Sequence, residues 1–358
     1  MGRKGAYGMG ENMKLAIIGA GVIAQTRHVS AFQANGVEIA AIYDRRAEKA
    51  HALADPLGAK AYTDYDELLR ESDVDAVSIC TRTDLHCPMA VAAAEAGKNI
   101  FLEKPMAMNA AEAKQIVEAV ERNKVVFMLG MLNRFRTESQ ILTARRERGE
   151  MGEIYHVDAR WIRRRGIPAN PWFTQKALSG GGPAIDIGVH TIDLAWYLMG
   201  CPEPVSVSAM THHRLGKVYA KGMEHYGSTV PISGEMDTED SAVAFMRLAD
   251  KKSMTLTVSW AINGPDEDFN LKIYGTKEGA TLNPFVIYGM DKGYCVETRP
   301  IFTRDDAWAE GFEHEIGHFV QCVRDGRTPI TSAQNCYTVA RIIEALYESD
   351  RTGREILL

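Results

Sequence analysis

Residues 13–24 read MKLAIIGAGVIA, and this stretch decides the fold of the first part of the chain. An apolar run typical of a buried strand ends at Ile18, a Gly-Ala-Gly turn begins at Gly19, and a helical pattern continues to about Ala34. Strand, glycine turn and helix in this order are the setting in which G-x-G-x-x-A binds the phosphates of a dinucleotide. The stretch therefore predicts the start of a doubly wound, nucleotide-binding sheet.

Each position of the glycine turn has a physical task. Gly19 permits the tight turn, Gly21 lets the backbone approach a pyrophosphate, and Ala24 is small enough for close packing of helix on strand. The helix start at Val22 and Ile23 offers free N–H groups and the positive end of the helix dipole. We expect Gly19, Gly21, Val22 and Ile23 to bind the cofactor.

Asp44 follows the second predicted strand, residues 38–43. An acidic residue at this point of the fold accepts hydrogen bonds from the adenosine ribose, and its charge repels the 2′-phosphate of NADP. Arg45 and Arg46 come next and could instead bind that phosphate. We favour NAD, with NADP as the alternative, and expect Asp44 and Arg45 to contact the cofactor. Asp44 could also cap the following helix.

Strands and helices continue to alternate as far as Leu129, which predicts a parallel α/β sheet. Further strands are expected at 59–62, 74–80, 99–102 and 125–129, and helices after Asp64 or Asp66, over 84–96 and over 109–122. Ligands of such sheets bind beyond the carboxyl ends of the strands. Lys104 lies just after one such end, which places it on the nicotinamide side unless it is an ordinary surface lysine.

A second stretch, GGGPAIDIGVHTID at 180–193, predicts a helix that begins at Pro183 and runs to Gly200. Most of its faces are apolar, so the helix is expected to be buried. Its polar residues share one stripe: Asp186, His190, Asp193 and Tyr197. Buried acids and an imidazole must be satisfied or used chemically, and the alternative is a solvated face.

These segments together resemble the Gfo/Idh/MocA family of oxidoreductases. The resemblance rests on GAGVIA, on Asp44, on Glu-Lys-Pro at 103–105 and on GGGPAIDIGVHTID, and it runs from about Lys14 to the C-terminus. It implies hydride transfer between nicotinamide and a secondary alcohol of a sugar, inositol or related polyol. The family's catalytic group maps onto Lys104, Asp186 and His190.

The resemblance also implies roles for these residues. His190 would take the hydroxyl proton, Lys104 would hydrogen-bond the reacting oxygen, and Asp186 would hold substrate hydroxyls. Cofactor contacts are implied for Thr81, His86 and Glu103. The family's TPNxxH segment reads TRTDLH at 81–86 here, so no role carries over to the residues that replace Pro-Asn.

The second half of the chain predicts an α+β domain with a large, mostly antiparallel sheet. Strands are expected at 154–165, 205–211, 241–248, 254–261 and 269–274, and helices at 135–150, 308–324 and 333–348. By resemblance, Arg163 and Trp172 are candidates for the sugar site, against a sheet-face arginine and a core tryptophan. The domains are expected at 13–133 and 134–358, after a flexible tail at 1–12, with the last helix free to pack back on the first domain.

The composition and net charge of the chain argue against several classes of binding partner. The 358 residues are 46% apolar and carry a net charge of −6, which argues against nucleic acid and an anionic membrane as partners. No apolar run approaches ~18 residues, and the six cysteines show no metal-binding spacing, so we expect a cytoplasmic protein without a metal.

By resemblance, the open face of the sheet is expected to form the interface of a homodimer or homotetramer. Loop 211–237 is expected to be a flap or a subunit contact.

Two other functions stay open at this point. One is a glycosidase that oxidises and re-reduces its sugar with tightly held NAD, and the other is a non-catalytic sensor that binds a dinucleotide. A sensor need not keep Lys104, Asp186 and His190, so their presence argues against it.

Overall fold

A computed structural model describes residues 13–168, 170–216, 236–264, 267–301 and 307–358 of the chain. It divides into two compact units, Met1–Phe135 with Asp306–Tyr337 and Arg136–Asp305 with Thr338–Leu358. The expected tail at 1–12 and residues 217–235 of the expected flap lie outside the described residues. Among the described residues, no helix is both long and apolar enough to cross a membrane.

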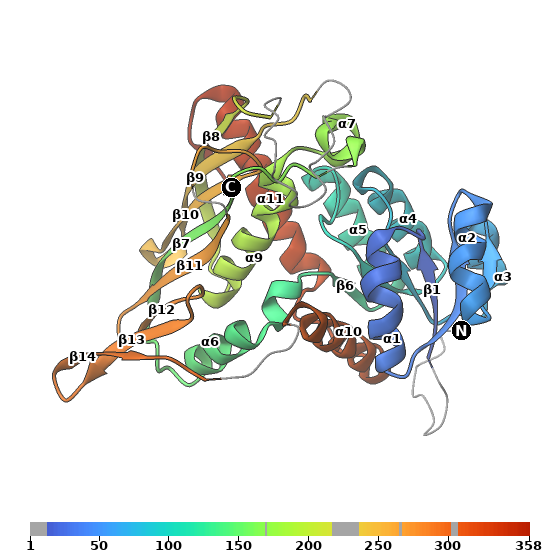
Figure 1. The fold of residues 1–358 in the computed structure, drawn as a ribbon, viewed down its shortest axis with the longest axis horizontal. Helices are drawn as coiled ribbons and strands as arrows, with labels where there is room; N and C mark the ends of the chain where they lie inside the picture. Colours follow the sequence, from blue (N-terminus) through green and yellow to red (C-terminus); the bar gives the residue numbers. More distant parts are fainter. Residues whose placement is uncertain (1–12, 169, 217–235, 265–266, 302–306) are drawn as a thin grey trace. The chain divides into compact units, whose positions relative to one another are not determined.

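The first unit is built on a six-stranded sheet in the order β3-β2-β1-β4-β5-β6 (Figure 1). Every neighbouring pair of strands is parallel, which confirms the doubly wound sheet. The strands are β1 Lys14–Ile18, β2 Glu38–Tyr43, β3 Lys60–Tyr62, β4 Ala76–Ile79, β5 Asn99–Leu102 and β6 Phe127–Leu129. β4 is buried along its whole length because helices cover both faces of such a sheet.

Among the described residues of this unit, α3 and α5 begin at a side chain that caps the helix. Asp64 accepts a hydrogen bond from the Glu67 N–H and Asn109 accepts one from the Glu112 N–H, as N-cap side chains do. The helices are η1 Ala24–His28 (a π-helix), α1 Val29–Ala34, α2 Ala47–Ala54, η2 Asp55–Leu57, α3 Tyr65–Glu71, η3 Thr83–Leu85, α4 His86–Glu95, α5 Ala110–Asn123, η4 Leu132–Phe135 and α10 Ala307–Asp325.

Helix α10 is distant in sequence from the rest of the first unit but packs beside α1 (Figure 1). Phe312 and Phe319 of α10 belong to the same apolar core as Phe32 of α1 and Phe101 of β5. The aromatic rings meet edge to face, with centroids 5.6 Å apart between Phe101 and Phe319. The core of the nucleotide-binding fold is therefore completed by residues near the end of the chain.

The second unit contains a nine-stranded sheet in the order β14-β13-β12-β11-β7-β10-β9-β8-β15. Its neighbours are antiparallel except for β7 and β10, which confirms the mostly antiparallel α+β prediction. The strands are β7 Ile154–Arg163, β8 Pro204–His212, β9 Ser241–Leu248, β10 Ser253–Ser259, β11 Glu267–Gly275, β12 Gly279–Thr281, β13 Val286–Asp291, β14 Tyr294–Thr298 and β15 Ile356–Leu357.

One face of this sheet carries helices and the other does not. Helix α9 packs on β7 and β10, with α6 against α9 (Figure 1). No helix labelled in Figure 1 covers the opposite face, called the open face below. The helices are α6 Thr137–Glu147, α7 Lys176–Ser179, α8 Pro183–Asp186, α9 Gly188–Leu198 and α11 Ala333–Thr352, with the short turns η5 Pro171–Thr174 and η7 Ala249–Lys251.

The single helix predicted from Pro183 to Gly200 is wrong in one respect, because it is interrupted at Ile187. That residue has φ −109° and ψ −26°, and it ends α8 and precedes α9. Gly188 lies close against neighbouring atoms: an added Cβ would be 3.3 Å from the Pro183 carbonyl oxygen and 3.8 Å from the Val258 side chain. The interruption places Asp186 and His190 on two successive helices instead of on one continuous stripe.

Candidate active site

The glycine turn has the geometry that a dinucleotide requires. Gly19 has φ +100°, and a Cβ there would lie 3.0 Å from the Cys80 carbonyl oxygen, so both conformation and space require glycine. A Cβ on Gly21 would meet nothing closer than 3.9 Å. The protein itself therefore leaves room beside Gly21, as the approach of an outside phosphate demands. The adjoining Val22 is 77% exposed at the start of the helix.

Asp44 is tied to this turn. Its Oδ2 accepts a hydrogen bond from the Ala20 N–H at 3.2 Å, and its Oδ1 accepts one from the Arg46 N–H at 3.0 Å. Arg46 is the residue before α2, and no side chain caps that helix. Asp44 thus does not serve as the helix cap that we considered. Its carboxylate stands next to the glycine turn at the end of β2, and Arg45 beside it is exposed.

Thr81 gives an independent sign that a polar ligand fits here. Its methyl carbon would lie 3.2 Å from a Cβ on Gly19, so the residue adjoins the turn. The Thr81 hydroxyl oxygen is buried and has no hydrogen-bond partner among the described residues. A buried hydroxyl without a partner is costly, and a bound cofactor would satisfy it.

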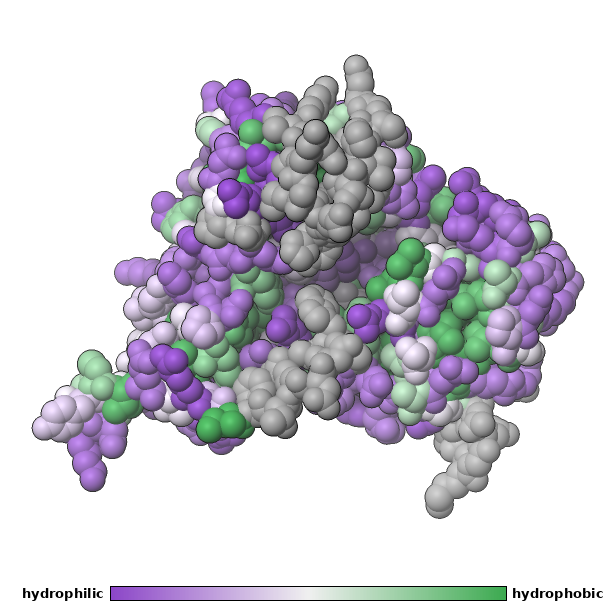
Figure 2. Space-filling view, viewed as in Figure 1, coloured by the Kyte–Doolittle hydropathy of each residue, from purple (hydrophilic) through white to green (hydrophobic). Residues whose placement is uncertain are grey.

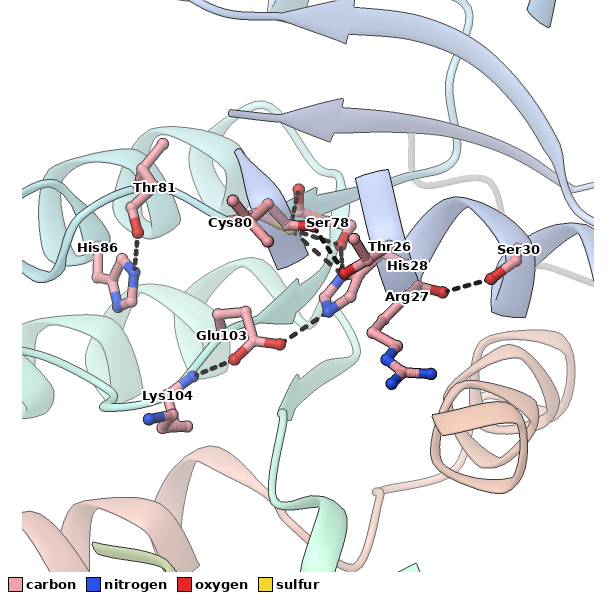
Figure 3. A network of polar contacts seen from close by, with 11 residues as sticks. Thr26, Arg27, His28, Ser30, Ser78, Cys80, Thr81, His86, Glu103 and Lys104 are labelled. Atoms are coloured by element: carbon pink, nitrogen blue, oxygen red, sulfur yellow. Dashed lines mark hydrogen bonds and ion pairs between the residues drawn. The ribbon is translucent and has the colours of Figure 1, made fainter. Parts of the chain in front are cut away.

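The segment Glu103–Lys104–Pro105 follows β5 and is held by its backbone and by one carboxylate (Figure 3). The Glu103 N–H donates to the Ile79 carbonyl oxygen at 2.9 Å. Glu103 Oε2 accepts from the Lys104 N–H at 3.2 Å, and its Oε1 lies 2.7 Å from His28 Nε2. Lys104 is half-buried and stands at the carboxyl end of the strand, as the sequence predicted.

The His28 side chain is fully buried beside strands β4 and β5 and makes three polar contacts (Figure 3). Besides Glu103, its Nδ1 lies 2.9 Å from Ser78 Oγ and 3.3 Å from Cys80 Sγ. Burial, the largest single influence, lowers the pKa of His28, but the neighbouring Cys80 and Glu103 outweigh it and hold the pKa well above 6.5. The ring therefore favours the charged form that pairs with the Glu103 carboxylate.

His86 also lies inside the first unit. Its Nδ1 is 2.7 Å from the Pro105 carbonyl oxygen and its Nε2 is 3.1 Å from the Thr81 carbonyl oxygen. Burial lowers the pKa of His86 below its usual value, although the two carbonyl oxygens oppose that shift. Both ring nitrogens are therefore directed at the backbone of segments that we expected to bind the cofactor.

In the second unit, Asp186 is held by a tryptophan that sequence reasoning missed. Asp186 Oδ2 accepts a hydrogen bond from Trp260 Nε1 at 3.1 Å, and Trp260 is fully buried. Asp186 itself is only 8% exposed. A buried carboxylate needs such a donor, because an unsatisfied charge there would be costly.

Glu239 and Tyr347 explain two of the three glycines before α8, Gly181 and Gly182. Its Oε2 accepts from the Gly182 N–H at 3.0 Å, and its Oε1 accepts from the Ala184 N–H at 3.1 Å and from the Tyr347 hydroxyl at 2.9 Å. A Cβ on Gly182 would lie 2.2 Å from the Glu239 carbonyl oxygen, and one on Gly181 would lie 2.0 Å from the Tyr347 hydroxyl. The glycines thus let this buried carboxylate approach the helix start that carries Asp186.

The His190 ring lies beside Trp161 of β7, which in turn contacts Phe269 of β11. Its ring centroid is 5.8 Å from that of Trp161, which in turn lies 4.7 Å from Phe269. The Arg163 guanidinium is 5.3 Å from the Trp161 ring centroid, and Trp161 Nε1 donates to Glu267 at 3.1 Å. Sequence reasoning named Arg163 but missed Trp161, although alternation puts the two on the same side of the strand.

The remaining predicted residues lie elsewhere. Trp172 stacks on Phe173 with centroids 3.8 Å apart, and none of the contacts described above includes it. Tyr197 contacts Arg146 of α6 through its carbonyl oxygen and ring. Arg165 donates to the Ile262 carbonyl oxygen at 3.0 Å and to Asn263, so it supports a loop. No cluster of three or more His, Cys, Asp or Glu side chains that could hold a metal occurs among the described residues.

Comparison with known proteins places the whole chain in one group. A family model described as "Oxidoreductase family, NAD-binding Rossmann fold" matches residues 13–131, and one described as "GFO/IDH/MocA C-terminal domain" matches residues 140–281. D-glucoside 3-dehydrogenase of Escherichia coli K12 is 32% identical over 349 residues, 97% of each chain. The scyllo-inositol 2-dehydrogenase (NAD(+)) of Bacillus subtilis is 28% identical over 90% of this chain and 89% of its own.

Among solved structures, levoglucosan dehydrogenase in complex with NADH and levoglucosan superposes with a TM-score of 0.85. The alignment covers 97% of this chain and 99% of that one, at 22% identity. At this identity the likeness concerns the fold alone.

Proposed function

The chain belongs to the Gfo/Idh/MocA family of NAD-binding oxidoreductases, and we propose that it transfers a hydride between NAD and a secondary alcohol of a sugar, inositol or related polyol. The observation that carries the proposal is the placing of His190 against the Trp161 ring, in the helix that follows the buried carboxylate of Asp186. An imidazole beside an aromatic surface suits a ligand with an apolar ring face and reactive hydroxyls.

The first unit would hold the cofactor. Gly19, Gly21 and the N–H groups of Val22 and Ile23 would bind the pyrophosphate. The Asp44 carboxylate would accept from the adenosine ribose, with Arg45 at the edge of that position, and it disfavours NADP by charge. The buried Thr81 hydroxyl would gain the partner that it lacks. The nicotinamide supplies the hydride chemistry when bound, and the protein supplies orientation and proton transfer.

Three side chains would act on the substrate. His190 would accept the hydroxyl proton, because an imidazole titrates near neutral pH. Lys104 would donate a hydrogen bond to the reacting oxygen and stabilise the charge that develops on it. Asp186, fixed by Trp260, would accept hydrogen bonds from substrate hydroxyls.

The substrate is proposed to be uncharged. Arg163 adjoins Trp161 and is the better supported of the two substrate candidates, while Trp172 stays a prediction. The nearby Arg165 donates to the Ile262 carbonyl oxygen and to Asn263, so it is not proposed to bind an anionic group of the substrate. The two relatives named above act, by their names, on a D-glucoside and on scyllo-inositol. Trp161 and Phe269 would supply the apolar surface.

The test is a substrate screen followed by two substitutions. D-glucosides, inositols and levoglucosan are offered with NAD and with NADP, and NADH formation is followed by absorbance. His190→Ala and Lys104→Ala should each lower kcat by about 10²-fold or more, with NADH binding unchanged and with His51→Ala, an exposed histidine, as control. Full turnover in either variant contradicts the assignment, and release of an aglycone without net NADH would point to the glycosidase alternative.

Assembly and location are also proposed. Large apolar side chains are exposed on strands β8, β9, β11 and β13, among them Met210, Val243, Phe245, Tyr274 and Tyr288. Figure 2 shows further apolar side chains on the β13–β14 hairpin. Exposed apolar surface of this kind marks an interface, so we propose a homodimer or homotetramer through the open face. All six cysteines are free thiols, which fits the reducing cytoplasm.

A further inference from the structure

Two buried histidines of the first unit flank Lys104 without being able to meet a ligand themselves. His28 is 0% exposed and His86 is 1% exposed. A side chain closed off in this way cannot touch a substrate that enters from water. Their ring nitrogens nevertheless lie within hydrogen-bond distance of the residues on either side of Lys104. Their effect on a reaction must therefore pass through those neighbours.

On the N-terminal side, the connection runs through Glu103 (Figure 3). One carboxylate oxygen lies 2.7 Å from His28 Nε2, and the other accepts from the Lys104 N–H at 3.2 Å. The Glu103 side chain is 13% exposed, so water screens this pair little. The charge on His28 thus fixes the carboxylate, and the carboxylate fixes the Lys104 main chain.

The His28 ring has both aromatic and polar neighbours. Its ring lies among Phe32 of α1, Phe101 of β5 and Phe312 of α10, with centroids 5.4 to 6.3 Å away. Ser78 and Cys80 face it from β4 and the residues just after it, and Glu103 faces it from the end of β5. Of these facing groups, the Glu103 carboxylate is the acid that pairs with the imidazole.

His28 also ends an irregular element. The chain from Ala24 to His28 is a π-helix, between the glycine turn and α1. Such π-helical turns are rare and occur often at functional sites, where they direct a side chain that a regular helix would place elsewhere. In this chain the π-helix ends at His28, whose Nε2 lies 2.7 Å from Glu103 Oε1.

On the C-terminal side, the connection runs through Pro105. Its carbonyl oxygen is 2.7 Å from His86 Nδ1, and the opposite nitrogen of the same ring is 3.1 Å from the Thr81 carbonyl oxygen. His86 therefore lies between the Lys104 segment and the end of β4, and its neutral ring donates its one N–H to one of the two carbonyl oxygens. This contact accounts for His86 better than a direct contact with the cofactor, since both nitrogens already face the backbone.

We propose that His28 and His86 are positioning residues that fix Lys104 for its contact with the substrate, an inference that rests on the role proposed above for Lys104. A lysine ammonium stands at the end of a flexible stem, so its placement depends on a main chain that does not move. The contacts of His28 with Glu103 and of His86 with Pro105 hold the main chain on both sides of Lys104. Displacement of a catalytic group by about 1 Å costs on the order of 10²-fold in rate.

The activity test compares four variants with the wild type. His28→Leu removes the partner of Glu103, whereas the amide of His28→Gln can still donate to the carboxylate. We expect kcat to fall by about 10²-fold in His28→Leu, with the KM for NAD unchanged and with a clear part of the activity kept in His28→Gln. His51→Gln is the matched control, since His51 is exposed on α2. His86→Asn should lower kcat in the same way.

A second measurement does not depend on turnover. The Lys104 amide donates to Glu103, so its hydrogen exchange in the folded protein should accelerate in His28→Leu and stay unchanged in His51→Gln. Where His28→Leu does not fold, Glu103→Gln removes the charge but keeps the shape, and it should show the same acceleration.

Unchanged kcat and unchanged Lys104 exchange in a folded His28→Leu protein would overturn the proposal. A rise in the KM for NAD alone would also overturn it, by assigning His28 to cofactor binding. If the wild-type protein oxidises no sugar or cyclitol, the proposed function fails, and the exchange measurement still decides whether His28 holds Lys104.

Discussion

Trp260→Phe removes one hydrogen bond from Asp186 and keeps an aromatic ring at the same position. The indole Nε1 donates to Asp186 Oδ2 at 3.1 Å, and Trp260 is fully buried. A hydrogen bond to a charged group contributes about 1.5–3 kcal/mol. At about 1.4 kcal/mol per tenfold, the loss of this bond in the transition state lowers kcat/KM for the sugar by about 10- to 100-fold.

A second tryptophan provides the matched control. Trp196 is 4% exposed, and its Nε1 donates to the Pro202 carbonyl oxygen at 2.7 Å, a contact that does not include Asp186 or His190. Trp196→Phe should cost comparable stability, measured by urea denaturation, but leave kcat/KM near the wild-type value. Steady-state kinetics with sugar and NAD varied separately checks both. Equal kcat/KM in the two variants would refute the role given to Trp260.

The remaining predictions concern the cofactor, the assembly and pH. Asp44→Ala removes the carboxylate that repels a 2′-phosphate, so kcat/KM with NADP relative to NAD should rise by about tenfold or more, as cofactor kinetics would detect. Phe245→Lys places a charge on the open face and should yield monomers by light scattering, with NADH binding retained. The folded pKa of His28 is raised, so its stabilising contribution is complete below about pH 6.5 and is lost as pH rises through the folded pKa. The difference in unfolding free energy between wild type and His28→Gln should therefore shrink as the pH rises above about 6.5.

The sheet of the first unit could be predicted from the sequence because its signals are local. Each strand is a short apolar run, and two of the following helices begin at a nearby cap, Asp64 for α3 and Asn109 for α5. The glycine turn is likewise local, since Gly19 is required by its own φ angle. What the sequence did not predict is the closing of the core by α10, because Phe319 meets Phe101 across a separation that no periodic pattern encodes.

In the second unit, the strands that were missed are short or form the exposed β13–β14 hairpin. Every residue of β14 is exposed, so no apolar alternation marks it as a strand. The interruption at Ile187 was missed for another reason. The residues around it are compatible with a continuous helix, and the close approach of Gly188 to Val258 of β10 is a tertiary contact.

The same division separates the proposed reacting groups from the residues that contact them. Lys104, Asp186 and His190 could be named in advance because a motif in the nearby sequence marks each one. Their supports carry no such mark: Trp260 lies far along the chain from Asp186, and His28 lies 75 residues before Glu103. The glycines before α8 show the consequence most directly. In the sequence this stretch indicated a helix start at Pro183, yet the absent side chains of Gly181 and Gly182 make room for Tyr347 and Glu239, whose contacts with this segment only the folded chain reveals.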